Sequence, residues 1–504
     1  MTDLHIHPQD AFNEEWLSQA KPSTWQNPTA TGRYNLLVIG GGSGGLVSAV
    51  GANGVGARVA LVEKNILGGD CLNAGCVPSK TIIRSAKIIG DLRRASEFGI
   101  HVPDGVSADF GQVMERMRRL RANISHHDSA YRFQNLGIDT FFGSGKFTSP
   151  NTFEVAGETI HFKKAVIATG SRPIVLPIPG LAEAGFLTNE SVFFHLTELP
   201  KRLAVIGGGP IGAELSQTFQ RLGSQITIFD IGPQILGRED ADAAAIVQKA
   251  LAEDGVQFRL SAQIKRVEQR NGEKVIIFEQ GGSQHELAVD DILLAVGRQA
   301  NKEGLGLEAA GVETHKRGIT VNDRLQTTNP NIYAVGDVAS KYQFTHTADE
   351  MARIVIQNAL FFGRRKFSDV IVPWVTFTDP EVAHVGMYPK DAEAAGIQID
   401  TFTTQIAEID RGRADGESGF VKIHVKRGSD KIVGATIVAK HAGEIIGEIG
   451  VAMRAGAGMN VLRQTVHAYP TTAEAIRKTA DAWNRTRLTP TVAGIFNRWM
   501  RWTR

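Results

Sequence analysis

Short apolar runs that lead directly into glycine-rich segments recur along the chain. Residues 34–39 (YNLLVI) precede GGGSGG at 40–45, and residues 202–206 (RLAVI) precede GGGPIG at 207–212. A continuous apolar run of this length between turn residues is typical of a strand buried on both faces, as in a parallel sheet. The pattern therefore predicts α/β units in which a buried strand is followed by a glycine loop and a helix.

The two runs belong to one internal repeat. In each copy a helix rich in small residues follows the glycines, and a second apolar run (58–62 and 225–229) is followed by an acid, Glu63 or Asp230. Each acid lies 23 residues after the first glycine of its loop. One such loop is a weak signal, but two loops in the same setting indicate two Rossmann-like dinucleotide-binding domains.

The glycines of each loop have three separate functions. The first permits the tight turn, the second lets the backbone approach a pyrophosphate, and the third lets the helix pack closely on the strand. In order they are Gly40, Gly42 and Gly45 in the first copy and Gly207, Gly209 and Gly212 in the second. The helix N-terminus offers N–H groups to the phosphates, and Pro210 suits its first turn. Glu63 and Asp230 are placed to accept hydrogen bonds from a ribose 2′-hydroxyl, the alternative being a solvated acid at a strand end.

The strand-to-glycine pattern returns later in the chain, and a different pattern then follows it. The recurrences lie at 164–170, 291–298 and 331–338. Residues 145–155 indicate an intervening β-rich stretch, and residues 350–363 indicate a helix. From about residue 370, three apolar strands and a helical stretch at 444–456 predict a separate α+β domain.

Composition narrows the class of protein. The chain of 504 residues is longer than one hydrophobic core usually supports, so we expect several domains. Its 42% hydrophobic and 21% charged residues are typical of a globular protein. The net charge of +2 gives no indication of nucleic-acid binding. No stretch predicts a membrane-spanning helix or a secretory signal, so we expect a cytoplasmic protein. Residues 1–33 are polar and contain three prolines, and we expect them to form an extension outside the core.

The only two cysteines are Cys71 and Cys76, in the sequence CLNAGC. A structural disulfide is disfavoured because it would close a short loop, which constrains the unfolded chain little, and because cytoplasmic thiols stay reduced. The two remaining possibilities are a redox-active pair and two inert thiols. Five residues of regular helix advance about 7.5 Å, whereas a disulfide prefers Cα atoms about 5.5–6 Å apart. The segment must therefore be irregular, as Gly68, Gly69 and Gly75 would allow. A helix that begins near Cys76 would favour its thiolate.

Five motifs in order give the chain a family resemblance. They are CLNAGCVPSK at 71–80, ATGSRP at 168–173, AVGR at 295–298, IYAVGDV at 332–338 and YPTTAEA at 469–475. With them the chain resembles the pyridine nucleotide-disulfide oxidoreductases, which include dihydrolipoamide dehydrogenase, glutathione reductase and mercuric reductase. The resemblance runs from about Tyr34 to about Arg487 and is strongest to the mercuric reductase-like branch.

The resemblance implies FAD and NAD(P) as cofactors and a homodimer. It implies an α/β fold with two Rossmann-like domains and a C-terminal α+β dimerisation domain. The implied boundaries are 34–180 and 298–348 for the FAD-binding domain, 181–297 for the NAD(P)-binding domain, 349–487 for the dimerisation domain and 488–504 for a basic tail.

The resemblance also implies roles for individual residues. For FAD these are Gly40, Gly42, Gly45, Glu63, Gly145, Gly170 and Asp337, and for NAD they are Gly207, Gly209, Gly212, Asp230 and Gly297. Cys76 is implied to be the thiol that faces the flavin and Cys71 the thiol that exchanges with substrate. Lys80 matches the lysine near the flavin and Glu214 its partner, the alternative for either being an unpaired surface charge. No resident metal site is predicted.

The C-terminal signature departs from the family pattern at one position. The family places a histidine before the proline and a glutamate five residues later; here Tyr469 precedes the proline and Glu474 has its expected place. A tyrosine, with a pKa near 10, is poorly suited to general-base work at pH 7. His467 is a candidate acid/base, with a structural role as the more common alternative. Mercuric reductases carry the tyrosine, but they also use a C-terminal cysteine pair, which this sequence lacks.

Two further features bear on partners. A carboxylate at position 230 repels the 2′-phosphate of NADP, and residues 231–233 contain no arginine, so we expect NADH to be favoured over NADPH. Near the C-terminus, apolar residues fall at helical spacing among arginines; they are Val492, Ile495, Phe496 and Trp499. Such a helix can lie on an anionic membrane surface, but it more often packs on its own protein or a partner subunit, which we expect here.

The sequence thus predicts a flavoprotein that uses NAD(P)H to reduce a disulfide or metal-ion acceptor through Cys71 and Cys76. Two alternatives stay open. One is a dihydrolipoamide dehydrogenase that oxidises a carrier-bound dithiol with NAD. The other is a flavin-bound redox sensor whose disulfide state alters an interaction of the basic tail.

Overall fold

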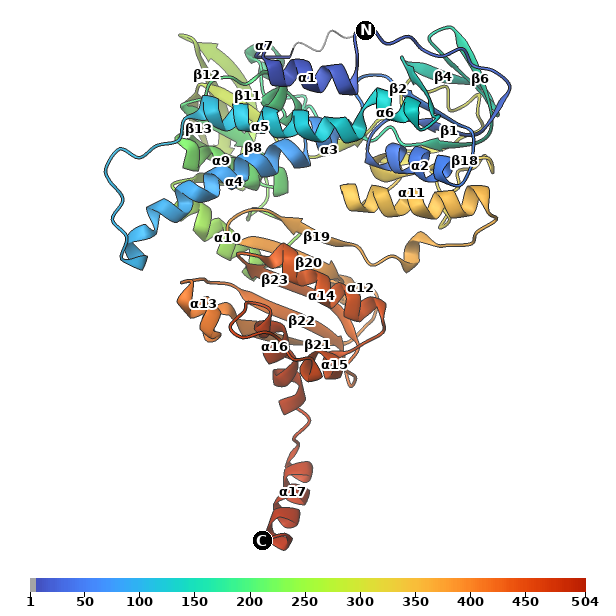
Figure 1. The fold of residues 1–504 in the computed structure, drawn as a ribbon. Coiled ribbons are helices and arrows are strands. Elements are labelled where there is room, and N and C mark those ends of the chain that lie inside the picture. The colour runs from blue at the N-terminus through green and yellow to red at the C-terminus, as the bar shows by residue number, and fades with distance from the viewer. Residues whose placement is uncertain (1–5) are drawn as a thin grey trace. The chain divides into compact units, whose positions relative to one another are not determined.

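The structure is a computed structural model and describes residues 6–504. Its contacts divide the chain into two compact units, one made of residues up to 231 and 255–370, the other of 232–254 and 371–504. The first unit contains both glycine-loop repeats, and the second contains the C-terminal α+β region; Figure 1 follows the chain through them.

A seven-stranded sheet carries the first repeat. Its strands are β1 (Arg33–Ile39), β2 (Val59–Glu63), β3 (Asp139–Phe142), β4 (Gly145–Ser149), β5 (Thr152–Val155), β6 (Glu158–Ile167) and β18 (Ile332–Ala334). β1 pairs in parallel with β2 and β6, whereas β4 and β5 join the other end of β6 as antiparallel hairpins. Because β1 has a neighbour on each side, its residues from Leu36 to Ile39 are buried, as the apolar run predicted.

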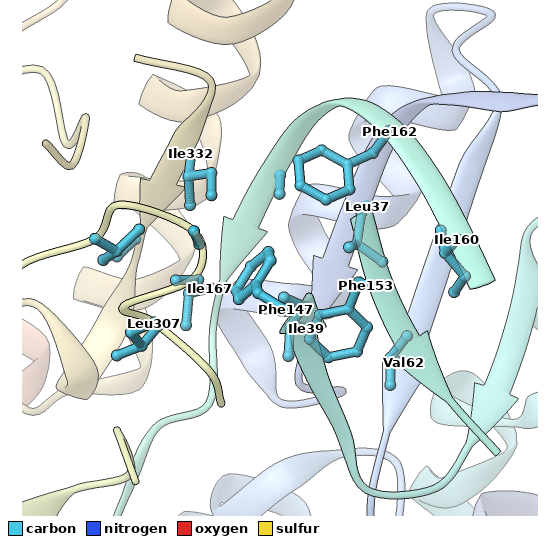
Figure 2. Close-up of a cluster of buried hydrophobic side chains, with 14 of the residues drawn as sticks. Leu37, Ile39, Val62, Phe147, Phe153, Ile160, Phe162, Ile167, Leu307 and Ile332 are labelled. Carbon is cyan, nitrogen blue, oxygen red and sulfur yellow. The ribbon is translucent and has the colours of Figure 1, made fainter. Parts of the chain in front are cut away.

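One hydrophobic core belongs to this sheet and joins segments that are far apart in the chain (Figure 2). The ring of Phe147 meets those of Phe153 and Phe162 edge-on, with centroids 5.0 and 5.9 Å apart. Leu307 and Ile332 belong to the same core, although they follow the second repeat in sequence. The chain therefore leaves this domain, builds the second repeat and returns to complete the first core.

The second repeat builds a four-stranded parallel sheet in the order β10-β9-β8-β14. Its strands are β8 (Arg202–Ile206), β9 (Gln225–Asp230), β10 (Gln257–Leu260) and β14 (Asp291–Leu294). An antiparallel sheet of β11 (Gln263–Arg270), β12 (Glu273–Gln280) and β13 (Ser283–Val289) follows β10. The sequence did not predict this antiparallel sheet, because β13 opens with four exposed polar residues in succession and so has no apolar pattern.

Each glycine loop ends where a helix begins. Helix α2 (Ser43–Gly54) follows Gly42, and α9 (Pro210–Leu222) follows Gly209 with Pro210 in its first turn, as predicted. Three further helices complete the arrangement around the loops: α4 (Cys76–Arg93), α5 (Phe110–Ser125) and α11 (Thr345–Leu360). Helix α4 packs against α5 and α9, and α11 packs against α2.

The second unit is built on a five-stranded antiparallel sheet in the order β19-β20-β23-β22-β21. Its elements are β19 (Pro373–Thr376), β20 (Glu381–Gly386), β21 (Ile399–Gln405), β22 (Phe420–Lys426), β23 (Ile432–Ala439), α14 (Ala442–Arg454), α15 (Met459–Gln464) and α16 (Glu474–Arg485). Helices α14 and α16 supply apolar residues to its core, among them Ile446, Ile449 and Ile476. The three predicted strands and the predicted helix all belong to this unit.

Residues 232–254, which include α10 (Ala241–Glu253), belong to the second unit although they follow β9 in sequence. The buried ammonium of Lys422 lies 3.0 Å from Asp240 and 2.7 Å from Asp242. Glu239 accepts hydrogen bonds from the Tyr388 hydroxyl and the Trp374 indole. Because a buried charge must be paired, Lys422 holds this segment against the C-terminal sheet. The interval of 181–297 for the NAD(P)-binding domain stays a prediction.

The N-terminal segment differs from our expectation, since its helix α1 (Ala11–Ala20) contributes buried residues to the core. Helix α1 packs on α5, and the side chains of Trp16 and Ala20 are fully buried. The guanidinium of Arg121, on α5, lies 3.9 Å from the centre of the Trp16 ring. The polar composition of residues 1–33 was misleading because one large aromatic side chain suffices to fix a short helix.

The last helix, α17 (Pro490–Trp502), has no buried residue. Among residues 6–504, no helix has both the length and the apolar character needed to cross a membrane.

Replacing Trp16 with alanine should lower the free energy of unfolding by about 3–5 kcal/mol, because it removes a fully buried indole and leaves a cavity. Urea denaturation followed by circular dichroism measures the change. Trp499→Ala removes an exposed indole and should leave the transition within about 0.5 kcal/mol of the wild type. Equal effects of the two substitutions would show that α1 is not part of the core.

Candidate functional site

The two glycine loops have the same geometry. Gly40 and Gly207 have φ angles of +106° and +104°, and a Cβ atom there would lie 2.4 and 2.5 Å from a backbone oxygen of the neighbouring strand connection. A Cβ atom at Gly45 or Gly212 would lie 1.8 or 1.9 Å from the carbonyl oxygen of the first glycine. At Gly209, in contrast, nothing lies within 4 Å, and at Gly42 only the Cα atom of Gly69 does, at 3.5 Å.

This geometry matches the three functions expected of the glycines. The first and third positions are closed by the protein's own backbone, whereas the second is open toward a helix N-terminus, where N–H groups can bind a pyrophosphate. The residues therefore fit two dinucleotides.

The two acids of the repeat bind their own loops. Glu63 accepts a hydrogen bond of 2.6 Å from the N–H of Gly41, and Asp230 accepts one of 2.7 Å from the N–H of Gly208. Glu63 is buried, which raises its pKa, while backbone N–H groups act in the opposite direction. Each acid fixes the turn of its glycine loop; the predicted bond to a ribose hydroxyl remains a prediction.

The cysteine segment is irregular, as the spacing required. Helix α3 (Gly69–Asn73) ends before Gly75, and α4 begins at Cys76. A Cβ atom at position 75 would lie 2.9 Å from the backbone carbonyl oxygen of Asp70, so a side chain there would crowd the backbone between the two helices. Both thiols are free, Cys71 half-buried and Cys76 exposed, and they hydrogen-bond to each other. Cys76 therefore has the helix N-terminus that favours a thiolate.

The electrostatics distinguish the two thiols. A hydrogen bond from Cys71 is the main cause that lowers the pKa of Cys76 to about 6, with the Thr345 hydroxyl and the Lys80 ammonium also stabilising the thiolate. Although the residue as a whole is exposed, the protein around its sulfur partly desolvates it, which acts in the opposite direction. The same hydrogen bond, together with burial, raises the pKa of Cys71. At pH 7 Cys76 is thus the thiolate and Cys71 the thiol.

Lys80 and Glu214 form the ion pair that the resemblance implied. The Lys80 ammonium lies 2.8 Å from the carboxylate of Glu214, whose side chain is buried on α9. Lys80 lies one turn after Cys76 on α4, so this pair connects the thiol helix to the second repeat.

Asp337 lies in a polar network that reaches the cysteine segment. Ser171 donates a hydrogen bond of 2.6 Å to Asp337 and accepts one of 2.7 Å from Arg298. Arg298 also lies 3.3 Å from Asp70, the residue before Cys71. Burial raises the pKa of Asp337, and Ser171 and Arg298 oppose this. The carboxylate keeps 20% of its surface exposed and has capacity to accept further hydrogen bonds, which suits a polyol hydroxyl, as the implied FAD role requires.

The remaining predicted glycines differ in their surroundings. Gly170 has a φ of +66° and nothing within 4 Å of its Cβ position, and Gly297 has a φ of +119° with only Ile174 nearby at 3.6 Å. Both leave room for a ligand. At Gly145 a Cβ atom would lie 2.3 Å from the ring of Phe153, so packing within the β4–β5 hairpin is sufficient reason for glycine there.

Sequence reasoning missed a group of residues that support the cysteine segment. Asn73, two residues after Cys71, accepts a hydrogen bond of 3.0 Å from the Trp16 indole. Its backbone carbonyl accepts one of 3.0 Å from Arg121, a fully buried guanidinium whose pKa burial lowers to about 9. The Thr345 hydroxyl, at the start of α11, lies 3.3 Å from the Cys76 sulfur. These partners are distant in sequence, and no spacing or motif could have indicated them.

The three C-terminal candidates are not brought together as an acid–base pair. The hydroxyl of Tyr469 donates to Asp410 at 2.8 Å, which raises its pKa. His467 has both ring nitrogens engaged, with Glu448 at 2.8 Å and the carbonyl of Thr465 at 3.2 Å, which favours a structural role. One buried carboxylate oxygen of Glu474 has no hydrogen-bond partner among residues 6–504.

These features define a class of protein that holds two dinucleotides beside a pair of redox-competent thiols. The chain matches the family described as pyridine nucleotide-disulphide oxidoreductase over residues 34–352 and the dimerisation domain of that family over residues 372–480. The chain therefore belongs to the pyridine nucleotide-disulphide oxidoreductase family, and it is a flavoprotein disulfide oxidoreductase.

Curated relatives fall into two groups. The chain is 35% identical over 456 residues to a mercuric reductase of Staphylococcus aureus, which covers 90% of this chain and 83% of the relative. It is 34% identical over 459 residues to a dihydrolipoyl dehydrogenase of Thermus scotoductus, covering 90% of this chain and 98% of the relative.

Among solved structures, the HOCl-induced flavoprotein disulfide reductase RclA from Escherichia coli, in a Cu(II) complex, matches with a TM-score of 0.80. Its sequence identity is 30%, and the match covers 90% of this chain and 100% of that chain. The α/β fold with FAD and NAD domains followed by a dimerisation domain is therefore confirmed.

The thiolate of Cys76 should titrate near pH 6. Because its pKa is lowered in the folded protein, the thiolate persists at neutral pH and is lost as the pH falls through about 6. Thiolate absorbance of the reduced protein measures this. Cys71→Ala removes the main hydrogen-bond donor and should raise the pKa of Cys76 toward the ordinary thiol range. Lys80→Met should raise the same pKa by less. Lys87→Met, on the same helix, is the control; an unchanged titration in Cys71→Ala would contradict the assignment.

Proposed function

We propose that this protein is an NAD(P)H-dependent reductase whose acceptor, a disulfide or a metal ion, reacts at Cys71. The observation that carries the proposal is the unequal thiol pair, a Cys76 thiolate at a helix N-terminus beside a Cys71 thiol. When bound, FAD and NAD(P)H supply the electron pair. The Cys71–Cys76 disulfide takes up two electrons and one proton and opens into the Cys76 thiolate and the Cys71 thiol.

The acceptor then reacts at the free thiol. With a disulfide acceptor, Cys71 loses its proton and attacks one sulfur; Cys76 then attacks Cys71, which re-forms the protein disulfide and releases the second thiol. With a metal acceptor, Cys71 loses its proton and the two thiolates bind metal. Their two electrons pass to the metal as the Cys71–Cys76 disulfide re-forms, which reduces one Hg(II) to Hg(0) or two Cu(II) to Cu(I). Among residues 6–504 there is no group of three or more His, Cys, Asp or Glu side chains that could hold a metal ion.

Tyr469 favours reduction of an acceptor over oxidation of a dithiol. Oxidising dihydrolipoamide requires a base that removes a thiol proton, and a tyrosine whose pKa is raised by Asp410 is a poor base at neutral pH. The mercuric reductase and RclA relatives support an acceptor of the metal or disulfide type. The dihydrolipoyl dehydrogenase relatives support the second candidate, dithiol oxidation with NAD.

We also propose that the dimerisation domain assembles a homodimer.

Anaerobic titration with NADH, followed by an acceptor screen, tests the proposal. A long-wavelength charge-transfer band should appear after two electrons and should be absent in Cys76→Ser.

Turnover with Cu(II), Hg(II) or a small disulfide should exceed oxidation of dihydrolipoamide by NAD. Tyr469→His restores the family's histidine five residues before Glu474 and should raise dihydrolipoamide oxidation, whereas Tyr469→Phe should not. Two-electron reduction to plain reduced flavin, without the band, would refute the disulfide relay.

We further propose that NADH is the preferred reductant, because Asp230 presents a carboxylate at the end of β9. The wild type should have a higher kcat/KM with NADH than with NADPH. Asp230→Asn keeps an acceptor for the Gly208 N–H but removes the charge, so it should narrow the ratio between the two by raising kcat/KM for NADPH. An unchanged ratio in Asp230→Asn would mean that this carboxylate does not discriminate.

A further inference from the structure

Helix α17 has a composition unlike the rest of the chain. From residue 482 to residue 504 the sequence contains five arginines and no acidic residue. Its large apolar side chains are exposed: Ile495 to 60%, Phe496 to 53%, Trp499 to 55% and Trp502 to 76%. An exposed apolar patch of this size indicates a site of contact with a partner or a membrane.

The apolar and basic residues of α17 lie on different faces. At 3.6 residues per turn, the apolar side chains fall within an arc of roughly 120°; they are Val492, Ile495, Phe496, Trp499 and Trp502. Arg498 and Arg501 fall outside that arc. The N-terminus of the helix is capped: the side chain of Thr489 accepts a hydrogen bond from the N–H of Val492, and Pro490 occupies the first turn.

We propose that α17 binds an anionic lipid surface, lying in the plane of the membrane with its aromatic face in the headgroup region. The charge supports this occupant, since a cluster of arginines without any acid complements anionic headgroups. Trp and Phe rings suit that region because they combine an apolar body with, in Trp, a polar N–H. The helix is about 20 Å long at 1.5 Å per residue, too short to span a bilayer.

A partner subunit fits these observations less well. The family's dimerisation domain ends at residue 480, before α17 begins, so the shared dimer does not require the helix. Protein interfaces are also rich in tryptophan and arginine, so the choice between the two rests on charge: residues 482–504 contain five arginines and no acid, which complements an anionic surface. The expectation from sequence alone, that the tail packs on protein, is therefore replaced by this proposal.

Co-sedimentation of the FAD-loaded full chain with vesicles tests the proposal. The protein should bind vesicles of phosphatidylcholine mixed with phosphatidylglycerol, and should bind vesicles of phosphatidylcholine alone much less. High salt should reverse the binding. Arg498→Gln and Arg501→Gln should each lower the partition coefficient about fivefold, and Trp499→Ser with Trp502→Ser should abolish sedimentation.

A matched control exists elsewhere in the chain. Phe361 and Phe362 are exposed to 56% and 96% and precede Arg364 and Arg365, so Phe361→Ser with Phe362→Ser removes two exposed aromatic rings beside basic residues. This variant should bind vesicles like the wild type. NADH oxidation should be unchanged in all variants, which shows that they are folded.

Three outcomes would overturn the proposal. Equal binding to both kinds of vesicle would remove the role of the arginines. Loss of binding in the Phe361/Phe362 variant but not in the Trp499/Trp502 variant would assign the surface to another segment. No binding by the wild type, together with dissociation of the dimer in Trp499→Ser, Trp502→Ser on size-exclusion chromatography, would assign α17 to the partner subunit.

Discussion

The close contact between Gly42 and Gly69 is the constraint on which the site depends. A Cβ atom at position 69 would lie 2.5 Å from the Cα atom of Gly42, and the N–H of Gly68 donates to the carbonyl of Gly41 at 2.8 Å. The glycine loop predicted to bind a pyrophosphate is therefore in direct backbone contact with the segment that carries the thiols. Because the thiols must exchange electrons with a bound flavin, their distance from it is set by backbone contact rather than by flexible side chains.

The internal repeat adds a second level of rigidity. Glu63 accepts a hydrogen bond from the N–H of Gly41, and Asp230 accepts one from the N–H of Gly208, so each acid holds its glycine loop in one conformation. The same two acids lie where a dinucleotide ribose is expected. A single carboxylate in each repeat thus combines a structural bond with a position suited to recognition.

Local features of the site could be predicted from the sequence, and distant contacts could not. The strand at 202–206, the helix after Gly209 and the break between the cysteines follow from apolar runs, glycines and spacing within a few residues. The Trp16–Asn73 and Cys76–Thr345 contacts join residues 57 and 269 positions apart, and neither leaves a periodic signal. The role of His467, acid/base or structural, cannot be predicted from the sequence, because its partners Glu448 and the Thr465 carbonyl are identified only from the packing of the helices.

The burial of α1 has a consequence for where this protein begins as a folding unit. The family match starts at residue 34, yet the carbonyl of Ala20 accepts a hydrogen bond from Leu67, and Asn13 accepts one from Arg121. A chain trimmed to the family boundary would leave a guanidinium in an apolar pocket without its aromatic ring and its amide partner. The smallest autonomous unit of this flavoprotein is therefore longer than the segment by which its family is recognised.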